Sequence, residues 1–446
     1  MPSSRFSYAS DQLRDIAASV LEYGKSRGAT SAEVEVSEAF GQTVTVRCGD
    51  VETIEYNRDK AIAVTVYLGQ RRGHASSSDF SSQAMRDTVD AALSIAGFTA
   101  PDDCAGLADP DLLARDLRDL DLWHPWDLPV ERAIELAKAA EDAGYGVTSG
   151  ITNSEGATIT TQESQFFYGN SLGFLAGYPN SRHGVWCSLI AGRGDEMQRD
   201  DWYETARDPL DLPPAPSVGR RAGERAARRV GARKLATTRA PVLFEAPIAS
   251  SLLGHFVSAV SGGNLYRKSS FLLDSVGQQI FSPVVRIRDL PHVRKGLASS
   301  AFDDEGVATQ SRDVVKDGIL QGYFLGSYSA RKLGMRSTGN AGGNHNLMLQ
   351  DTGDDFAALL RKLDTGLLVT ELMGQGINGV TGDYSRGAAG FWVEKGEIAY
   401  PVQEITIAGN LKDMFRAVAA VGTDLMLRGS RQCGSILLEQ MTIAGD

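Results

Sequence analysis

The first hundred residues show a helical spacing of apolar positions, then a strand spacing, then a helical spacing again. After Ser10, apolar residues three and four positions apart predict a helix with one buried face, ending near Gly24 or Gly28. Apolar alternation then predicts strands of an antiparallel meander, at 34–36, 44–46 and 62–66. A second helix is predicted from Ser82 to Ala96. Residues 1–118 therefore read as a small α+β unit.

A middle region, 119–235, follows a segment of different composition. Residues 101–129 are rich in Asp, Pro and Leu, which indicates a linker or a segment that wraps over the surface. A helix is predicted over 130–143, and strand-like pieces follow at 157–161, 165–168 and 185–191. The helical segment 217–235 is strongly basic. We expect it to present a solvated face that balances an acidic protein, with nucleic-acid contact as the alternative.

The C-terminal half, 236–446, has the pattern of a β-rich domain. It opens with a strand at 242–244 and a helix over 248–260, and then becomes glycine-rich. Turn pairs such as Asp317-Gly318 and Lys395-Gly396 recur between strand-like runs. The predicted fold class is α+β, with an N-terminal helix and antiparallel-sheet region followed by this β-rich domain.

Charge and cysteine content narrow the class of protein. The 45 Lys and Arg against 56 Asp and Glu give a net charge of −11, which disfavours a protein that wraps nucleic acid over its whole surface. The four cysteines lie far apart without a C-x-x-C pair, so neither a disulfide framework nor a zinc ribbon is indicated. The N-terminus has no apolar signal region, and no run approaches the ~18 apolar residues of a membrane span. We therefore expect a cytoplasmic protein.

A G-x-G-x-x-G match occurs at Gly374–Gly379. A dinucleotide site of this kind requires a helix to begin there, because the N–H groups of its first turn bind the pyrophosphate. The residues that follow are again rich in glycine and lead into a strand-like run at 390–393. The sequence therefore argues against a dinucleotide-binding fold.

The helix predicted over 248–260 carries an apolar stripe with a histidine beside it. Leu252 and Phe256 belong to that stripe, and His255 flanks it. A single histidine in this position is usually a hydrogen-bonded residue at the edge of the core, since zinc needs three or four converging donors. The neighbouring Ser250 and Ser251 supply neither an imidazole nor a general base. Taken alone, this helix reads as structural.

Two polar loops are candidates for ligand contact. Residues 337–346 are crowded with Gly and Asn and contain His345, so their backbone could approach a peptide closely, or they could form the tip of a surface hairpin. Residues 382–387 place an acid, a phenol, a hydroxyl and a guanidinium together. An ion pair between Asp383 and Arg386 that braces a turn is the structural alternative there.

Long motifs in the C-terminal half carry a family resemblance. They lie at 262–263, 266–272, 302–307, 317–320, 337–343, 378–392, 400–411 and 432–438. Together they resemble the TldD/PmbA family, and the PmbA branch in particular. The N-terminal half resembles the family in the order of its predicted elements more than in its residue motifs.

The resemblance implies a dimer that encloses a chamber for unfolded peptides. In this family the TldD-type subunit is a zinc peptidase with an H-E-x-x-x-H helix and a cysteine near the C-terminus, and the PmbA type pairs with it. On the corresponding helix here, Ser250 replaces the first histidine, Ser251 replaces the glutamate, and His255 matches the second histidine. Because the general base and one ligand are missing, hydrolysis by this chain should be crippled. Cys433 resembles the family cysteine, but its surroundings follow the PmbA ending, so no ligand role is carried over.

The expected function is that of a PmbA-type subunit in a TldD/PmbA metallopeptidase complex acting on unfolded peptides. This chain would hold substrate and contain no metal of its own, with zinc in a TldD-type partner. Candidate peptide contacts are Arg267, Lys268, His345, Asp383, Tyr384, Ser385 and Arg386. One alternative is a homodimeric metallopeptidase with an atypical metal site built from His255, His345 and Cys433. Another is a structural or nucleic-acid-binding protein that uses the basic segment within 217–235.

Overall fold

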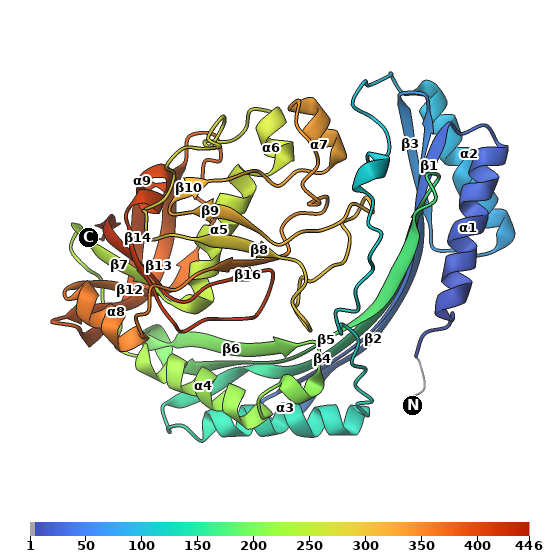
Figure 1. Cartoon of the computed structure of the whole chain (residues 1–446). Helices are drawn as coiled ribbons and strands as arrows, with labels where there is room; N and C mark the ends of the chain where they lie inside the picture. The colour runs from blue at the N-terminus through green and yellow to red at the C-terminus, as the bar shows by residue number, and fades with distance from the viewer. Residues whose placement is uncertain (1–4, 446) are drawn as a thin grey trace.

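The computed structural model describes residues 5–445. The first half of the chain builds a long, curved sheet with helices on its convex side, and the C-terminal half folds against the concave side (Figure 1). This order of elements confirms the predicted α+β class, with its strand-rich C-terminal part. Among the described residues, no helix combines the length and the apolar character needed to cross a membrane.

The curved sheet is antiparallel and has the strand order β3-β2-β1-β4-β5-β6. Its strands are β1 (Ser31–Arg47), β2 (Asp50–Leu68), β3 (Arg71–Ser77), β4 (Ile151–Asn170), β5 (Leu175–Ala191) and β6 (Gln198–Ala206). Along β1, buried residues alternate with more exposed ones, as expected of a strand with one face on a core. An antiparallel meander is present as β1–β3, but the runs at 34–36 and 44–46, predicted as separate strands, both belong to β1, and no turn divides them.

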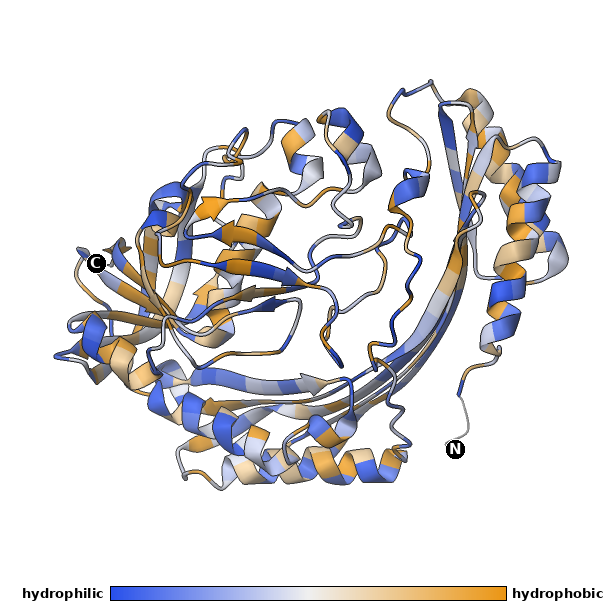
Figure 2. Ribbon diagram, in the orientation of Figure 1, coloured by the Kyte–Doolittle hydropathy of each residue, from blue (hydrophilic) through white to orange (hydrophobic). Residues whose placement is uncertain are grey.

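Four helices cover the convex side of this sheet. They are α1 (Ser10–Ser26), α2 (Ser82–Phe98), α3 (Val130–Tyr145) and α4 (Ala215–Arg228). Hydrophilic and hydrophobic residues alternate around α1 in Figure 2, and its apolar face packs on the sheet through Leu13, Ala17 and Val20. Helices α3 and α4 approach closely because Gly219 lies against the backbone of Ala140, where a Cβ atom would overlap with the Ala140 carbonyl. Short 3₁₀ helices occur at Pro110–Leu112, Gly194–Glu196 and Pro209–Asp211.

The curved sheet extends over both N-terminal sequence units. Strand β1 pairs with β2 on one side and with β4 on the other, where residues 33–46 align with residues 157–170. The proposed division between residues 118 and 119 lies in the segment that connects these strands. That division separates two helix pairs, α1–α2 and α3–α4, which pack on different stretches of one sheet.

The Asp-rich segment 101–129 runs against the C-terminal half. Its carboxylates form ion pairs there, including Asp102 with Lys332 at 2.9 Å and Asp109 with Arg331 at 3.0 Å. Arg331 also donates to the backbone carbonyls of residues 104, 106 and 107. The segment therefore wraps the surface as its composition predicts, and its acids pair with basic residues of the other half.

The basic helix α4 differs from the expected solvated face. Arg225 is largely buried and bridges Asp200 at 3.0 Å and Glu245 at 2.9 Å. The guanidinium of Arg221 stacks 3.5 Å from the ring centroid of Trp202. The expectation of a solvated face is therefore wrong for Arg225, whereas Arg221 remains exposed to solvent while it stacks on Trp202. Their partners come from β6 and from the residue before α5, which a local reading of the helix could not include. The helix also ends at Arg228 rather than near residue 235.

The C-terminal half contains two further sheets. One has the order β14-β13-β12-β7-β17-β15, and an additional pairing of β14 with β17 closes it on itself. Its strands are β7 (Thr238–Phe244), β12 (Gly366–Met373), β13 (Asp383–Glu394), β14 (Glu397–Asn410), β15 (Val418–Val421) and β17 (Ile436–Ala444). The other sheet, ordered β10-β9-β8-β11-β16, consists of β8 (Ile287–Leu290), β9 (Arg312–Lys316), β10 (Ile319–Leu320), β11 (Asn346–Leu349) and β16 (Arg431–Gln432).

Helices α5 (Ala246–Ala259), α8 (Phe356–Leu363) and α9 (Leu411–Arg416) pack on the larger C-terminal sheet. Helices α6 (Gly262–Tyr266) and α7 (Ser327–Lys332) pack against each other. Val242 and Phe244 of β7 share the main core with α5, whereas Leu243 packs with α8 in a separate cluster. Because successive side chains of a strand point to opposite faces, β7 and its neighbours β12 and β17 separate these two cores. Helix α5 is thereby held between the sheets, where its polar face can border a cavity.

Candidate functional site

Helix α5 is positioned by its apolar stripe. Leu252, Leu253 and Phe256 are buried in the main core, and Pro247 lies in the first turn, where its missing N–H removes no helical hydrogen bond. The predicted helix is confirmed with bounds two residues earlier at its start. Burial of this stripe turns Ser250 and Ser251 toward a cavity on the other side of the helix.

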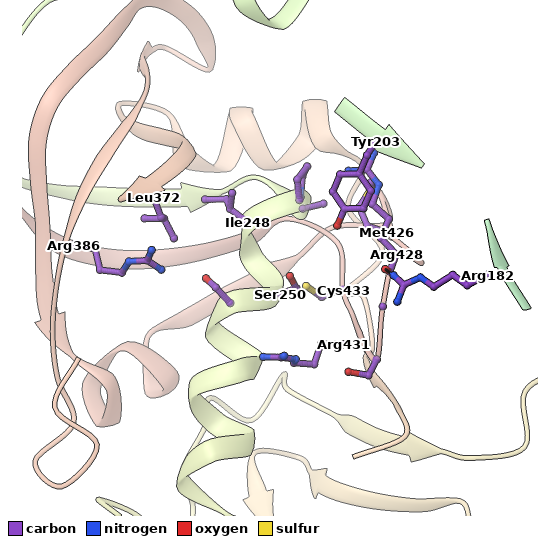
Figure 3. A pocket seen from close by; sticks show the side chains of 15 residues that line it. Arg182, Tyr203, Ile248, Ser250, Leu372, Arg386, Met426, Arg428, Arg431 and Cys433 are labelled. Atoms are coloured by element: carbon purple, nitrogen blue, oxygen red, sulfur yellow. Dashed lines mark hydrogen bonds between the residues drawn. The ribbon is translucent and has the colours of Figure 1, made fainter. Parts of the chain in front are cut away.

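The cavity has a volume of about 570 Å³ and is bordered by both halves of the chain. Figure 3 shows side chains reaching it from α5, from β13 and from the segment before β17. Arg182 and Tyr203 come from the curved sheet. The lining consists of Arg182, Tyr203, Ala246, Pro247, Ile248, Ser250, Ser251, Leu372, Arg386, Met426, Arg428, Gly429, Ser430, Arg431 and Cys433.

The lining is strongly basic, with four arginines and no Asp or Glu. Arg428 is paired with Glu204 at 3.0 Å and stacks on the ring of Trp202. In contrast, no carboxylate among residues 5–445 forms an ion pair with Arg386 or Arg431. Both of these guanidiniums point toward α5 (Figure 3). The electrostatic character of the cavity is therefore positive.

His255 lies on α5 beside this positive charge. Burial, followed by the charges of Arg386 and Arg431, lowers the pKa of the imidazole to about 4, so the ring is neutral at neutral pH. The ring packs edge-on against Tyr384 of β13, with centroids 5.9 Å apart. Burial raises the pKa of the Tyr384 phenol to about 12.

Several buried polar atoms between α5 and β13 make no hydrogen bond of normal geometry within the described residues. They are Ser251 Oγ, His255 Nε2, Tyr384 Oη and Arg386 Nε. Buried polar groups without partners cost free energy, so four of them close together call for an explanation, and a bound ligand is one. This cluster marks the region between α5 and β13 as the best candidate for a functional site.

The residues present do not fit a zinc ion. Ser250 and Ser251 take the positions that the resemblance assigns to a histidine and the catalytic glutamate. Burial, together with the charge of Asp424, raises the pKa of the Cys433 thiol to about 12, so the thiolate that binds metal is disfavoured. Residues 5–445 contain no group of three or more His, Cys, Asp or Glu arranged to hold a metal. Two guanidiniums beside His255 would also repel a divalent cation.

The donors of the proposed atypical metal site are not brought together. Cys433 lines the cavity and His255 lies next to it, but His345 belongs to a different cluster. There its Nδ1 lies 3.1 Å from Asp289, whose other carboxylate oxygen accepts the His345 backbone N–H. The loop around His345 is therefore held by this carboxylate.

The remaining predicted contacts are distributed over separate surfaces. Arg267 and Lys268 are exposed after α6, where Arg267 donates to Asn264 and Tyr266. They do not border the cavity.

Strand β13 separates the other predicted contacts by face. Tyr384 and Arg386 point toward α5, whereas Asp383 and Ser385 are exposed on the opposite face. Asp383 accepts hydrogen bonds from Thr381 and Asn410. The alternative of a bracing ion pair between Asp383 and Arg386 is therefore wrong, because alternation along the strand sends the two side chains in opposite directions.

Sequence reasoning missed Arg182, Arg428, Arg431 and Tyr203. The spacing of Arg428 and Arg431 just before Cys433 could have directed attention to that segment. Arg182 and Tyr203 carry no local signal, because only the packing of the curved sheet against the C-terminal half brings them to α5.

Comparison with known proteins agrees with this architecture. Models of the PmbA/TldA metallopeptidase domains match in three parts: domain 1 at residues 32–96, the central domain at 123–230 and the C-terminal domain at 237–445. The chain therefore belongs to the TldD/PmbA family of metallopeptidases.

Individual relatives place it in the PmbA branch. It is 51% identical to Metalloprotease PmbA of Escherichia coli O157:H7 over 95% of this chain and 94% of that protein. A crystal structure of a Bacteroides thetaiotaomicron protein, described as a proposed modulator of DNA gyrase, has 26% identity and a TM-score of 0.93 and covers 98% of this chain and 100% of that one. TldE from Thermococcus kodakarensis shares the fold, with a TM-score of 0.84 and 18% identity over 96% of this chain and 100% of that one.

Proposed function

We propose that this chain is the non-hydrolytic, peptide-holding subunit of a TldD/PmbA metallopeptidase complex in the cytoplasm. A TldD-type partner would supply the zinc and the general base, and unfolded peptides would be the substrates. The observation that carries the proposal is the chemistry of α5: two serines occupy the ligand and base positions, and two unpaired arginines face the same space.

Helix α5 lacks the groups that zinc-dependent hydrolysis of a peptide requires. A zinc-bound water needs a carboxylate to take its proton, and the Ser251 hydroxyl is far too weak a base at neutral pH. The homodimeric alternative, with metal held by His255, His345 and Cys433, loses support because His345 is engaged with Asp289. The nucleic-acid alternative loses support because Arg225 is held in ion pairs within the protein and Arg221 stacks on Trp202.

Holding an extended peptide is consistent with the edges of the curved sheet. Strand β3 pairs only with residues 62–68 of β2, so residues 50–61 are paired with β1 on one side alone within the described structure. That edge exposes apolar side chains such as Ile54 and Tyr56. An unpaired strand edge offers N–H and C=O groups to which an extended chain can add as a further strand.

Metal content and activity of the separate subunits test this proposal. We expect the purified chain to hold much less than one zinc per protomer by elemental analysis, to co-purify with a TldD-type subunit from its native host, and to cleave unfolded peptides only in that complex. His255→Ala should leave cleavage by the complex intact, whereas replacing the glutamate in the partner's H-E-x-x-x-H helix should abolish it. Zinc bound tightly by the isolated chain and lost in His255→Ala, together with cleavage by that chain alone, would overturn the proposal.

A further inference from the structure

We propose that the arginine-lined cavity beside α5 binds the carboxylate at the C-terminus of a peptide, with the last side chain of the peptide against its apolar wall. This inference rests on the proposed function, because it assumes that the chain meets peptides. According to this inference, the cavity next to Ser250 and Ser251 binds an anion and not a metal cation.

Charge is the first reason. Arg386 of β13 and Arg431 of β16 reach the cavity without forming an ion pair. Arg182 adds a third positive group, which donates hydrogen bonds to Thr205 and to a backbone carbonyl. The planar guanidinium can donate two parallel hydrogen bonds to a carboxylate, which makes arginine well suited to this ligand. No acid in the lining competes with such an anion.

The unpartnered donors are the second reason. The Nε–H of Arg386 and the hydroxyl of Ser251 are buried and make no hydrogen bond of normal geometry, and Ser250 and Ser430 add hydroxyl groups to the same lining. Nearby Cys433 carries its proton, since burial raises the pKa of its thiol. A neutral thiol together with these N–H and hydroxyl donors favours binding of an oxyanion.

The shape and the apolar wall favour a peptide terminus over inorganic phosphate. A volume of about 570 Å³ is within the range of small-ligand sites and accommodates one or two residues rather than a folded partner. Ile248, Leu372 and Met426 form an apolar part of the lining. Phosphate would use only the arginines and hydroxyl groups, whereas a C-terminal residue with an apolar side chain would also use the apolar wall.

Calorimetric titration of the full-length chain with matched peptides tests the assignment. The probes are a short unstructured peptide ending in Leu, the same peptide with an amidated C-terminus, and inorganic phosphate. We expect the free carboxylate to bind at least tenfold more tightly than the amide, and more tightly than phosphate. Equal affinity for acid and amide would overturn the proposal, and tighter binding of phosphate would overturn the assignment to a peptide carboxylate.

Three variants locate the binding to this cavity. Arg386→Gln and Arg431→Gln should each weaken the free peptide at least tenfold and leave the amide unchanged. Arg220→Gln removes one positive charge from the exposed side of α4 and should have no effect. If Arg220→Gln weakens binding as much as the cavity variants do, the effect is one of general charge and the site assignment fails.

Gly254→Ala provides a variant that keeps every charge. A Cβ atom on Gly254 would overlap with Nη1 of Arg431, so alanine should displace that guanidinium while favouring the helical conformation of α5. We expect weaker binding of the free peptide with a melting temperature no lower than that of the original chain. Unchanged binding in this variant would show that Arg431 does not hold the ligand.

Failure of this inference is distinguishable from failure of the proposed function. A chain that supports cleavage with its TldD-type partner but shows no preference for a free C-terminus refutes the carboxylate site alone. A chain that shows the preference but never associates with such a partner refutes the proposed complex alone.

Discussion

Acid should destabilise this protein in part through His255, and replacing that residue isolates the effect. The pKa of the imidazole is lowered to about 4 by burial and by the two nearby arginines. Between pH 4 and 6.5 the unfolded chain therefore holds the proton more tightly than the folded protein does. The stability that His255 contributes is complete above about pH 6.5 and is lost as the pH falls toward 4.

The size of this effect on the free energy of unfolding follows from the pKa values of His255 in the folded and unfolded states. A value of about 4 in the folded protein, against 6.5 in the unfolded chain, corresponds to about 3 kcal/mol at ~1.36 kcal/mol per pH unit. Because His255 is only partly buried, solvent screening should reduce this to about 1–2 kcal/mol. His255→Gln removes the titrating group. We expect that variant to be within about 1 kcal/mol of the original chain at pH 7.5 and relatively more stable at pH 4.5.

Urea titrations of both proteins from pH 4 to 8 provide the measurement, and the difference between the two profiles is the decisive quantity. Other groups titrate in the same interval: Asp303, whose pKa burial raises to about 7, contributes stability that is lost as the pH rises through that value. Such contributions cancel in the difference. A ¹³C-histidine NMR titration gives the pKa directly, and Arg386→Gln should raise it. A difference profile that is flat, or a His255 pKa near 6.5, would refute the electrostatic reasoning.

Three further predictions concern packing and charge. Phe256→Ala should destabilise the C-terminal half by about 3–5 kcal/mol in urea unfolding, because the ring is fully buried against two other phenylalanines, whereas Phe98→Ala, at a site 92% exposed, should cost less than about 0.5 kcal/mol. Arg225→Ala should lower stability by about 3–5 kcal/mol, since it leaves Glu245 without its cation and Asp200 with only Arg229, at 3.7 Å; a loss below about 1 kcal/mol would contradict that account. Tyr384→Phe should change stability by less than about 1 kcal/mol, because the hydroxyl makes no hydrogen bond of normal geometry, and a larger loss in thermal melting would reveal a partner for it.

The local elements of the fold were accessible from the sequence. The helices at α1, α2, α3 and α5 and the meander of β1–β3 follow from apolar spacing, which reports directly which side of an element faces a core. Leu252 and Phe256 were assigned to the buried face of α5, and both are buried. The correspondence of Ser250 and Ser251 to a histidine and a glutamate is a prediction from the family resemblance.

The candidate site depended on contacts between distant segments. Arg386 was selected for its chemistry, but its expected partner Asp383 lies on the other face of β13. Arg182 carries no local signal, and the spacing of Arg431 before Cys433 does not by itself assign it to the same cavity. Likewise, the basic residues of α4 were read as solvated because their acidic and aromatic partners lie on other elements.

The sequence by itself determined the periodic elements and the net negative charge. Tertiary structure alone decided which strands pair across the 101–129 segment, which arginines are neutralised, and which remain to face α5. The physical reason is that spacing along the chain specifies the face of an element, whereas sheet register and the packing of one half on the other specify which faces meet. In this protein the positive charge of the cavity results from the sheet register and from the packing of one half of the chain on the other.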